Sequence, residues 1–175
     1  LALYIGSSIG DFTPEGARGV LQNLRAQLLP GDTLPLGTDL GVSQHKDEAT
    51  LLAAYNDAQG VTAAFNRNIL TRLNRDLGAN FNPSTFRHKA IWNPTESRIE
   101  MHLESRTAQR VHIPKNCCGP ALAIDFAPGE TIHTENSYKF IASSVEALLK
   151  SASFHPTHAW HYPHHLFAVT LATAT

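Results

Sequence analysis

Residues 1–17 have the sequence LALYIGSSIGDFTPEGA, and this stretch decides the fold class. An apolar run of five residues ends in a turn rich in glycine and serine, which is typical of a buried strand of a parallel sheet followed by a functional loop. Thr13 can cap a helix that begins at Pro14 and Glu15, because proline suits the first helical position and a carboxylate favours the helix dipole. The order strand, loop, helix predicts an open α/β sheet.

A second strand is predicted after this helix. Residues 33–40, TLPLGTDL, have the composition of a strand that ends in a loop carrying Asp39, although Pro35 argues against full pairing in the centre of a sheet. Ligands of open α/β sheets bind at the carboxyl ends of the strands. The loops over residues 6–11 and 37–39 are therefore the first candidates for a site.

The middle of the chain has a different character. Apolar residues at helical spacing predict helices over residues 45–60 and 61–78. In residues 97–105, SRIEMHLES, apolar and polar residues alternate, which predicts a strand with one face buried and the other exposed. The flanking runs at 86–93 and 107–114 predict an antiparallel meander with it. The chain thus divides into α/β segments at 1–43 and 140–175 and an α+β insert at 44–139.

Composition excludes several classes of partner. The 175 residues have a net charge of -1 and a pI near 6.9, so neither a nucleic acid nor an anionic membrane is expected. No apolar stretch approaches the roughly 20 residues that a membrane helix needs. The adjacent cysteines Cys117 and Cys118 are poorly placed for a disulfide with each other, so we expect reduced thiols and a cytoplasmic protein.

Two polar groupings could bind a small molecule. Glu135 and Ser137 are two residues apart in HTENSYKF, so in a strand both face one side and could hold a ring N–H or an amine. Tyr55 and Thr62 flank the break at Gly60 between two predicted helices, where a phenol and nearby amides could bind a small zwitterion. The alternatives are a solvated strand face for the first grouping and helix caps for the second.

The segment 155–165, HPTHAWHYPHH, contains five histidines and raises the possibility of a metal site. Pro156 and Pro163 interrupt helical spacing, and neither cysteine nor carboxylate joins the histidines in sequence. We therefore expect a histidine-rich loop before the final strand. The alternative is a metal-binding module that uses His158, His161, His164 and His165.

Five stretches together resemble one family: YIGSSIGDFTPEGA, LPLGTDL, AAYNDAQGVTAAFNRNIL, SRIEMHLESRTAQ and HTENSYKF. They are similar to the S-adenosylmethionine-dependent histidine Nα-methyltransferases of ergothioneine biosynthesis, from Leu3 to about Ala172. The resemblance implies trimethylation of L-histidine to hercynine with S-adenosylmethionine as the methyl donor. It also implies the back half of a Rossmann-like methyltransferase sheet, with residues 44–139 as an inserted substrate-binding domain.

The resemblance assigns roles to single residues. Tyr55 corresponds to the residue that binds the substrate carboxylate, while Met101, Glu135 and Ser137 correspond to residues around the imidazole. Asp11 stands where the family has an asparagine that holds the amino-acid head of the substrate. No metal ligand is implied. The further residues implied are Thr62 and Phe65 near the substrate pocket, and Gly6, Ser7 and Ser8 beside the methyl donor.

Two departures from the family limit these expectations. An ionised Asp11 can only accept hydrogen bonds and would repel a substrate carboxylate, so a different amino acid or amine is the alternative substrate. The resemblance also places the main motif for S-adenosylmethionine in a first half of the family domain that this chain lacks. We therefore expect a fragment that is inactive alone and that pairs with the missing half, or with a second copy, through an exposed sheet edge.

Overall fold

The computed structural model describes residues 1–115 and 119–175, so the prediction for Cys117 and Cys118 lies outside the described residues. The described residues form two compact units. Among them, no helix is long and apolar enough to cross a membrane. Unit 1 consists of Leu1–Leu51, Trp92–Ile99 and Asn136–Thr175, and unit 2 of Leu52–Ile91 and Glu100–Glu135.

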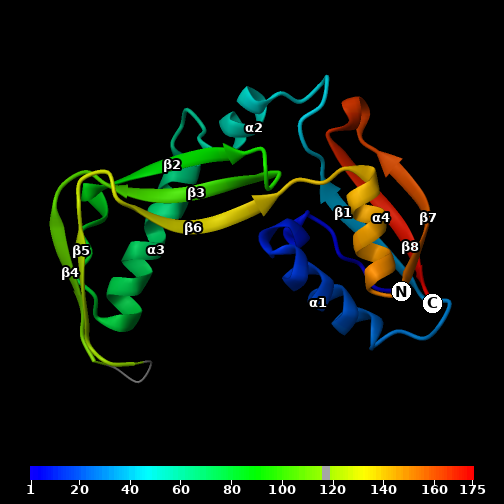
Figure 1. Ribbon diagram of the computed structural model, residues 1–175, viewed down its shortest axis with the longest axis horizontal. Helices are drawn as coiled ribbons and strands as arrows, with labels where there is room; N and C mark the ends of the chain where they lie inside the picture. The colour runs from blue at the N-terminus through cyan, green and yellow to red at the C-terminus, as the bar shows by residue number, and fades with distance from the viewer. Residues whose placement is uncertain (116–118) are drawn as a thin grey trace. The chain divides into compact units, whose positions relative to one another are not determined.

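Unit 1 is built on an antiparallel sheet with the strand order β1-β8-β7, in which Thr33 pairs with Thr173 and Phe154 with Ala174. Helices α1 and α4 contribute to one core with this sheet (Figure 1). The elements are α1 (Pro14–Arg25), β1 (Thr33–Asp39), α4 (Ala142–Ser151), β7 (Phe154–His161) and β8 (Phe167–Ala174), with 3-10 turns at Ser8–Asp11 and Pro163–His165.

The predicted start of helix α1 is confirmed. The Oγ1 atom of Thr13 accepts a hydrogen bond from the backbone N–H of Gly16 at 3.2 Å, and Pro14 occupies the first turn. The apolar face of the helix then buries Leu21 completely against the sheet and α4. Local capping and helical spacing therefore agree with the tertiary packing here.

The prediction of a buried strand over the first five residues is only partly right. The backbone N–H of Ala2 donates to the carbonyl oxygen of Thr33 and that of Tyr4 to Pro35, so this segment runs parallel to β1, but it forms only the Tyr4–Leu36 bridge and not a regular strand. Leu1, Leu3 and Ile5 are 73%, 65% and 63% exposed. The run was apolar on both faces, but only the face that carries Tyr4 packs on the core of unit 1.

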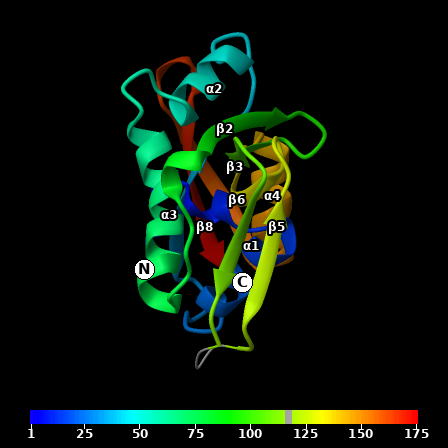
Figure 2. The same ribbon diagram turned by 90° about the vertical axis from the view of Figure 1, so that its left-hand side faces the viewer.

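Unit 2 combines helix α3 with two small sheets, of orders β2-β3-β6 and β4-β5 (Figure 2). Its core brings Phe86 and Phe126 edge to face at 5.4 Å, together with the fully buried Leu70 and Leu103. The elements in this part of the chain are α2 (Glu48–Tyr55), α3 (Val61–Leu77), β2 (Phe86–Asn93), β3 (Arg98–Ser105), β4 (Gln109–Ile113), β5 (Leu122–Phe126) and β6 (Thr131–Tyr138), with a 3-10 turn at Pro83–Thr85.

Two expected arrangements of strands differ from those observed. β4 pairs with β5, which was not predicted, and β3 has β6 as its second neighbour, so the three-stranded meander is wrong. The histidine-rich segment forms strand β7 as far as His161 and a 3-10 turn at Pro163–His165, so the prediction of a loop is wrong for its first part. A register shift between Pro156 and His158 accommodates the proline, and β7 is an edge strand, where proline is tolerated.

Candidate functional site

A polar cluster in unit 1 is centred on Asp39, at the end of β1. One carboxylate oxygen lies 2.8 Å from Nζ of Lys139, and the other pairs with Lys46. Nζ of Lys139 also donates to Oγ of Ser137 at 2.9 Å, and the backbone N–H of Asp39 donates to Oγ of Ser7 at 2.7 Å. The side chain of Lys139 is only 1% exposed, so the Asp39 carboxylate offsets a deeply buried positive charge.

The loop over residues 6–11 belongs to the same cluster, as expected from the two strand ends. Gly10 packs so closely on β6 that a Cβ atom there would lie 2.7 Å from the carbonyl oxygen of Tyr138. This approach fixes the turn that ends at Asp11. Partial burial raises the pKa of Asp11, and the positive charge of Lys139 opposes that rise. Ser137, Lys139 and Asp11 therefore share one electrostatic environment.

In unit 2, a buried hydrogen-bond network holds the end of helix α2, where Tyr55 lies. The side-chain N–H₂ group of Asn66 donates to Nδ1 of His88 at 3.0 Å and to the carbonyl oxygen of His102 at 3.2 Å. Nε2 of His88 then donates to the carbonyl oxygen of Tyr55 at 2.8 Å, which fixes the tautomer of the ring. His88 was not predicted as a functional residue, although its position two residues after the apolar Phe86 places both on the buried face of β2.

Asp57 caps helix α3 and positions Thr62 at its first turn. Its carboxylate accepts hydrogen bonds from the backbone N–H groups of Thr62 at 2.8 Å and of Val61 at 3.0 Å. These bonds lower the pKa of Asp57 to about 2, because they favour the charged form. For Thr62 the structure supports the helix-cap interpretation, and it leaves the predicted binding role untested.

We expect replacement of Asp57 by Ala to lower the unfolding midpoint by a few degrees at pH 7. The folded-state pKa lies below the ordinary value of 3.8, so this stabilisation is complete above about pH 4 and is lost as the pH falls from there through about 2. Thermal unfolding of the parent and the variant at several pH values measures this. A midpoint difference that persists undiminished at pH 2 would contradict the assignment.

The residues expected around the imidazole do not all share one face. Side chains alternate along β3 and β6. Met101 therefore points to the opposite face of the sheet from its neighbour His102, whereas Glu135 and Ser137 point to the same face as His133. His102 and His133 stack on each other, with ring centroids 4.5 Å apart. Glu135 and Ser137 therefore lie on one side of the sheet, and the buried Met101 lies on the other.

The polar face of β3 is not fully exposed, although the alternation of apolar and polar residues predicted that it would be. His102 is buried, and its Nε2 lies 3.2 Å from a carboxylate oxygen of Glu100. Burial lowers the pKa of His102, and the hydrogen bond with Glu100 opposes this. Glu100, His102 and His133 could not be predicted as a group, because His133 joins the other two only through the pairing of β6 with β3.

The remaining expected residues lie near the surface. Phe65 is 63% exposed on α3, where it borders a groove with Ile69 and Arg72. Gly6 has a φ of 82°, and a side chain there would meet no atom within 4 Å. Ser8 is exposed and begins the 3-10 turn, in which Ile9 and Gly10 are buried. The loop around Gly6 therefore borders open space.

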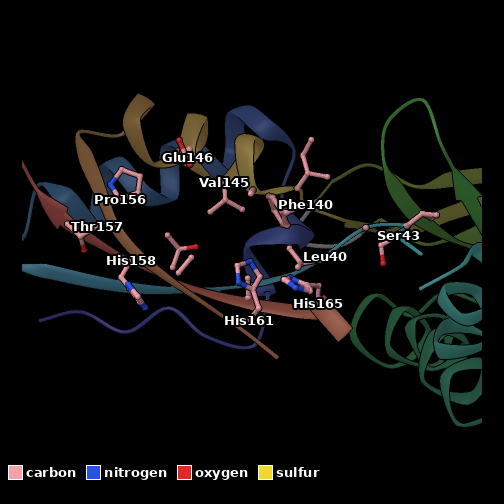
Figure 3. Close-up of a pocket in the computed structure, with 17 residues that line it drawn as sticks. Leu40, Ser43, Phe140, Val145, Glu146, Pro156, Thr157, His158, His161 and His165 are labelled. Carbon is pink, nitrogen blue, oxygen red and sulfur yellow. The ribbon is translucent and has the colours of Figure 1, made fainter. Parts of the chain in front are cut away.

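A cavity of about 460 Å³ lies among α4, β7 and β8 in unit 1 (Figure 3). Glu146, His158, His161 and His165 line it together with apolar side chains, and the rings of His161 and His165 are 4.6 Å apart. None of the expected site residues lines it. Within residues 1–115 and 119–175, the tail histidines do not gather into a group of three potential metal ligands.

Comparison with known proteins finds histidine methyltransferases both among family models and among individual relatives. Residues 1–174 match the family model described as "Histidine-specific methyltransferase, SAM-dependent". The chain is 46% identical over 172 residues to a histidine N-alpha-methyltransferase of Mycolicibacterium smegmatis, covering 98% of this chain and 51% of that protein. It is 43% identical to the Mycobacterium tuberculosis protein of the same name, covering 91% of this chain and 47% of that protein. The chain thus spans about half the length of these relatives.

More distant similarities were also found. An ergothioneine biosynthesis protein 1 of Schizosaccharomyces pombe is 27% identical over 87% of this chain and 18% of its own length. Among solved structures, an S-adenosylmethionine-dependent methyltransferase from Clostridium acetobutylicum superposes with a TM-score of 0.47 at 8% identity, covering 98% of this chain and 56% of that one.

Proposed function

Because the chain belongs to the family of histidine-specific, S-adenosylmethionine-dependent methyltransferases, we propose that it takes part in the Nα-methylation of L-histidine. Three successive transfers would give hercynine, the intermediate of ergothioneine biosynthesis. The cytoplasm, which supplies histidine and the methyl donor, is the proposed location. The observation that carries the proposal is the family match over residues 1–174, which includes every proposed site residue.

The proposed reaction depends mainly on positioning. When bound, S-adenosylmethionine supplies an electrophilic methyl group on a sulfonium sulfur. The protein must hold an uncharged amine about 3 Å from that carbon and in line with the bond that breaks. Gly6, Ser7 and Ser8 would border the donor, and the open space beside Gly6 leaves room for it. The substrate ammonium must first lose a proton to a base or to water.

The contacts of Ser137 support a role in holding the imidazole. Its Oγ accepts a hydrogen bond from the buried Lys139, which fixes the position of the hydroxyl group that would contact a ring nitrogen. Glu135, two residues earlier on β6, would accept from the other ring nitrogen. Together they would form hydrogen bonds with both ring nitrogens of histidine. An amino acid without an imidazole would bind less tightly, because the side chains of Glu135 and Ser137 would lose these partners. Tyr55 would bind the carboxylate.

Asp11 is expected to weaken histidine binding. Replacing Asp11 with Asn should lower the KM for L-histidine about tenfold, because an amide can donate to the substrate carboxylate where the aspartate repels it. Steady-state kinetics in the chimera described below measures this change, with Asp32→Asn as the control for loss of a surface carboxylate. An unchanged KM would show that Asp11 does not face the substrate carboxylate.

We assign residues 1–43 and 140–175, all of which lie in unit 1, to the methyltransferase core, and residues 44–139 to the substrate-binding domain. The exposed side chains of Leu1, Leu3 and Ile5 offer an apolar edge beside β1. We propose that this edge packs on the part of the family domain that the match to the relatives does not cover. Light scattering of the chain alone checks this, because a concentration-dependent dimer would show that a second copy covers the edge instead.

The test of the proposed function is a chimera in which this chain replaces the matched 172-residue region of the M. smegmatis relative. The chimera is incubated with S-adenosylmethionine and L-histidine, and product masses are measured beside the unaltered relative and the chain alone. Histidine carrying three added methyl groups is the expected result. Methylation only of another amine in a panel would overturn the substrate. No methylation by a folded chimera that binds S-adenosylmethionine would overturn the function.

A further inference from the structure

A group of three potential metal ligands lies on one face of strands β3 and β6 in unit 2. Glu100 and His102 are two residues apart on β3 and so face the same side. His133 on β6 stacks on His102 with an angle of 21° between the rings. One potential ligand atom from each of the three residues lies within 4.8 Å of the others. The sheet thus assembles two imidazoles and a carboxylate from distant parts of the chain.

The separation of the first two ligands already suits a metal ion. Nε2 of His102 and a carboxylate oxygen of Glu100 are 3.2 Å apart. Two ligand atoms that each lie about 2.0–2.1 Å from a tetrahedral zinc ion are about 3.3 Å apart. Because Nε2 of His102 lies beside this carboxylate, it is the nitrogen that would bind the ion, whereas Nδ1 is buried and has no hydrogen-bond partner among the described residues.

The third ligand completes the group from the exposed side. His133 is exposed, so its ring can turn toward an ion without disturbing the core. Its Nε2 donates to the backbone carbonyl oxygen of Glu135 at 3.2 Å, the kind of contact that orients a histidine for ligation through its other nitrogen. A fourth position would face solvent and be filled by water.

We propose that Glu100, His102 and His133 form a binding site for a divalent transition metal ion of the zinc class. Imidazole and carboxylate are ligands that zinc accepts, and two histidines with one acidic residue leave an open position. A bound ion would tie β6 to β3 within unit 2 and so hold the strand segment that leads into Glu135. The site uses none of the residues proposed to bind histidine or the methyl donor.

Zinc titration of the intact chain against a chromogenic chelator tests the site. The parent should take up zinc and unfold about 5–10 °C higher when the zinc concentration is 100 times the dissociation constant. His133→Ala and Glu100→Gln should each weaken binding at least about tenfold. Both retain the buried His102, and circular dichroism checks that they fold.

The matched control is the double substitution His161→Ala and His165→Ala. These histidines are also close together and exposed, but no third ligand joins them in the described part of the chain. The control should bind zinc as the parent does. Loss of binding in the control alone would place the metal on the tail and overturn the site, as would a parent that takes no zinc from the chelator. No step uses the methyl donor or histidine, so the result is independent of the proposed function.

Discussion

Replacing Glu135 with Ala is expected to lower kcat/KM for L-histidine about a hundredfold in the chimera, because a hydrogen bond to a charged group contributes about 1.5–3 kcal/mol. The proposed carboxylate accepts from a ring N–H of the substrate, and its loss would leave that N–H without a partner. Ser137→Ala removes a neutral hydrogen bond and should cost less, about tenfold. Initial rates over a range of histidine concentrations measure both effects.

Two comparisons make the Glu135 result specific. Glu130→Gln removes a carboxylate from the exposed turn before β6, where it accepts only from the backbone N–H of Ala127 among the contacts described, and it should leave kcat/KM unchanged. The preference for histidine over phenylalanine should fall in Glu135→Ala by the same factor as kcat/KM. If Glu135→Ala retains both the rate and the preference, the imidazole is held elsewhere.

Replacing Asp39 with Ala is expected to destabilise the folded chain by about 3–5 kcal/mol, because breaking a buried ion pair leaves a charge without compensation. Two lysines depend on this carboxylate: the side chain of Lys139 is 1% exposed and that of Lys46 is 9% exposed. The backbone contact from Asp39 to Ser7 is kept in the variant, so the effect isolates the carboxylate. Urea denaturation followed by circular dichroism measures the change.

The control for Asp39 is Asp76→Ala. Asp76 pairs with Arg72 and Arg75, but all three side chains are exposed, and exposed ion pairs contribute little to stability. Its unfolding midpoint should stay close to that of the parent. If Asp39→Ala were equally mild, water would have to reach the two lysines, and the cluster could not maintain the buried environment proposed for Ser137.

The helices were largely predictable, because their signals are local. Thr13 and Pro14 mark the start of α1, and the break at Gly60 separates α2 from α3, where Gly60 has a φ of 71°. The mixed α/β class and the strands β1, β3 and β8 also follow from short-range patterns. Each such signal depends on residues within one or two turns of chain, so no knowledge of the remainder is needed to read it.

The strand partners were not predictable in the same way. β4 lies beside β5 and not beside β3, and the proline-containing tail forms strand β7. Pairing depends on which segment meets which edge, and alternation within one strand carries no information about its neighbour. The exposure of Leu3 likewise follows from the absence of a covering element among the described residues, which the apolar run itself does not encode.

The candidate sites likewise contain some features that depend on local sequence and others that depend on long-range contacts. By itself the sequence determined the helix caps, the pairing of Glu135 with Ser137 on one strand face, and the motifs that resemble the family. Only the tertiary structure decided that Lys139 sits between Asp39 and Ser137, and that His133 stacks on His102. The Asp39–Lys139 ion pair and the stacking of His133 on His102 join residues far apart in the chain, and their distances are set by strand register and burial, which exist only once the sheets have formed.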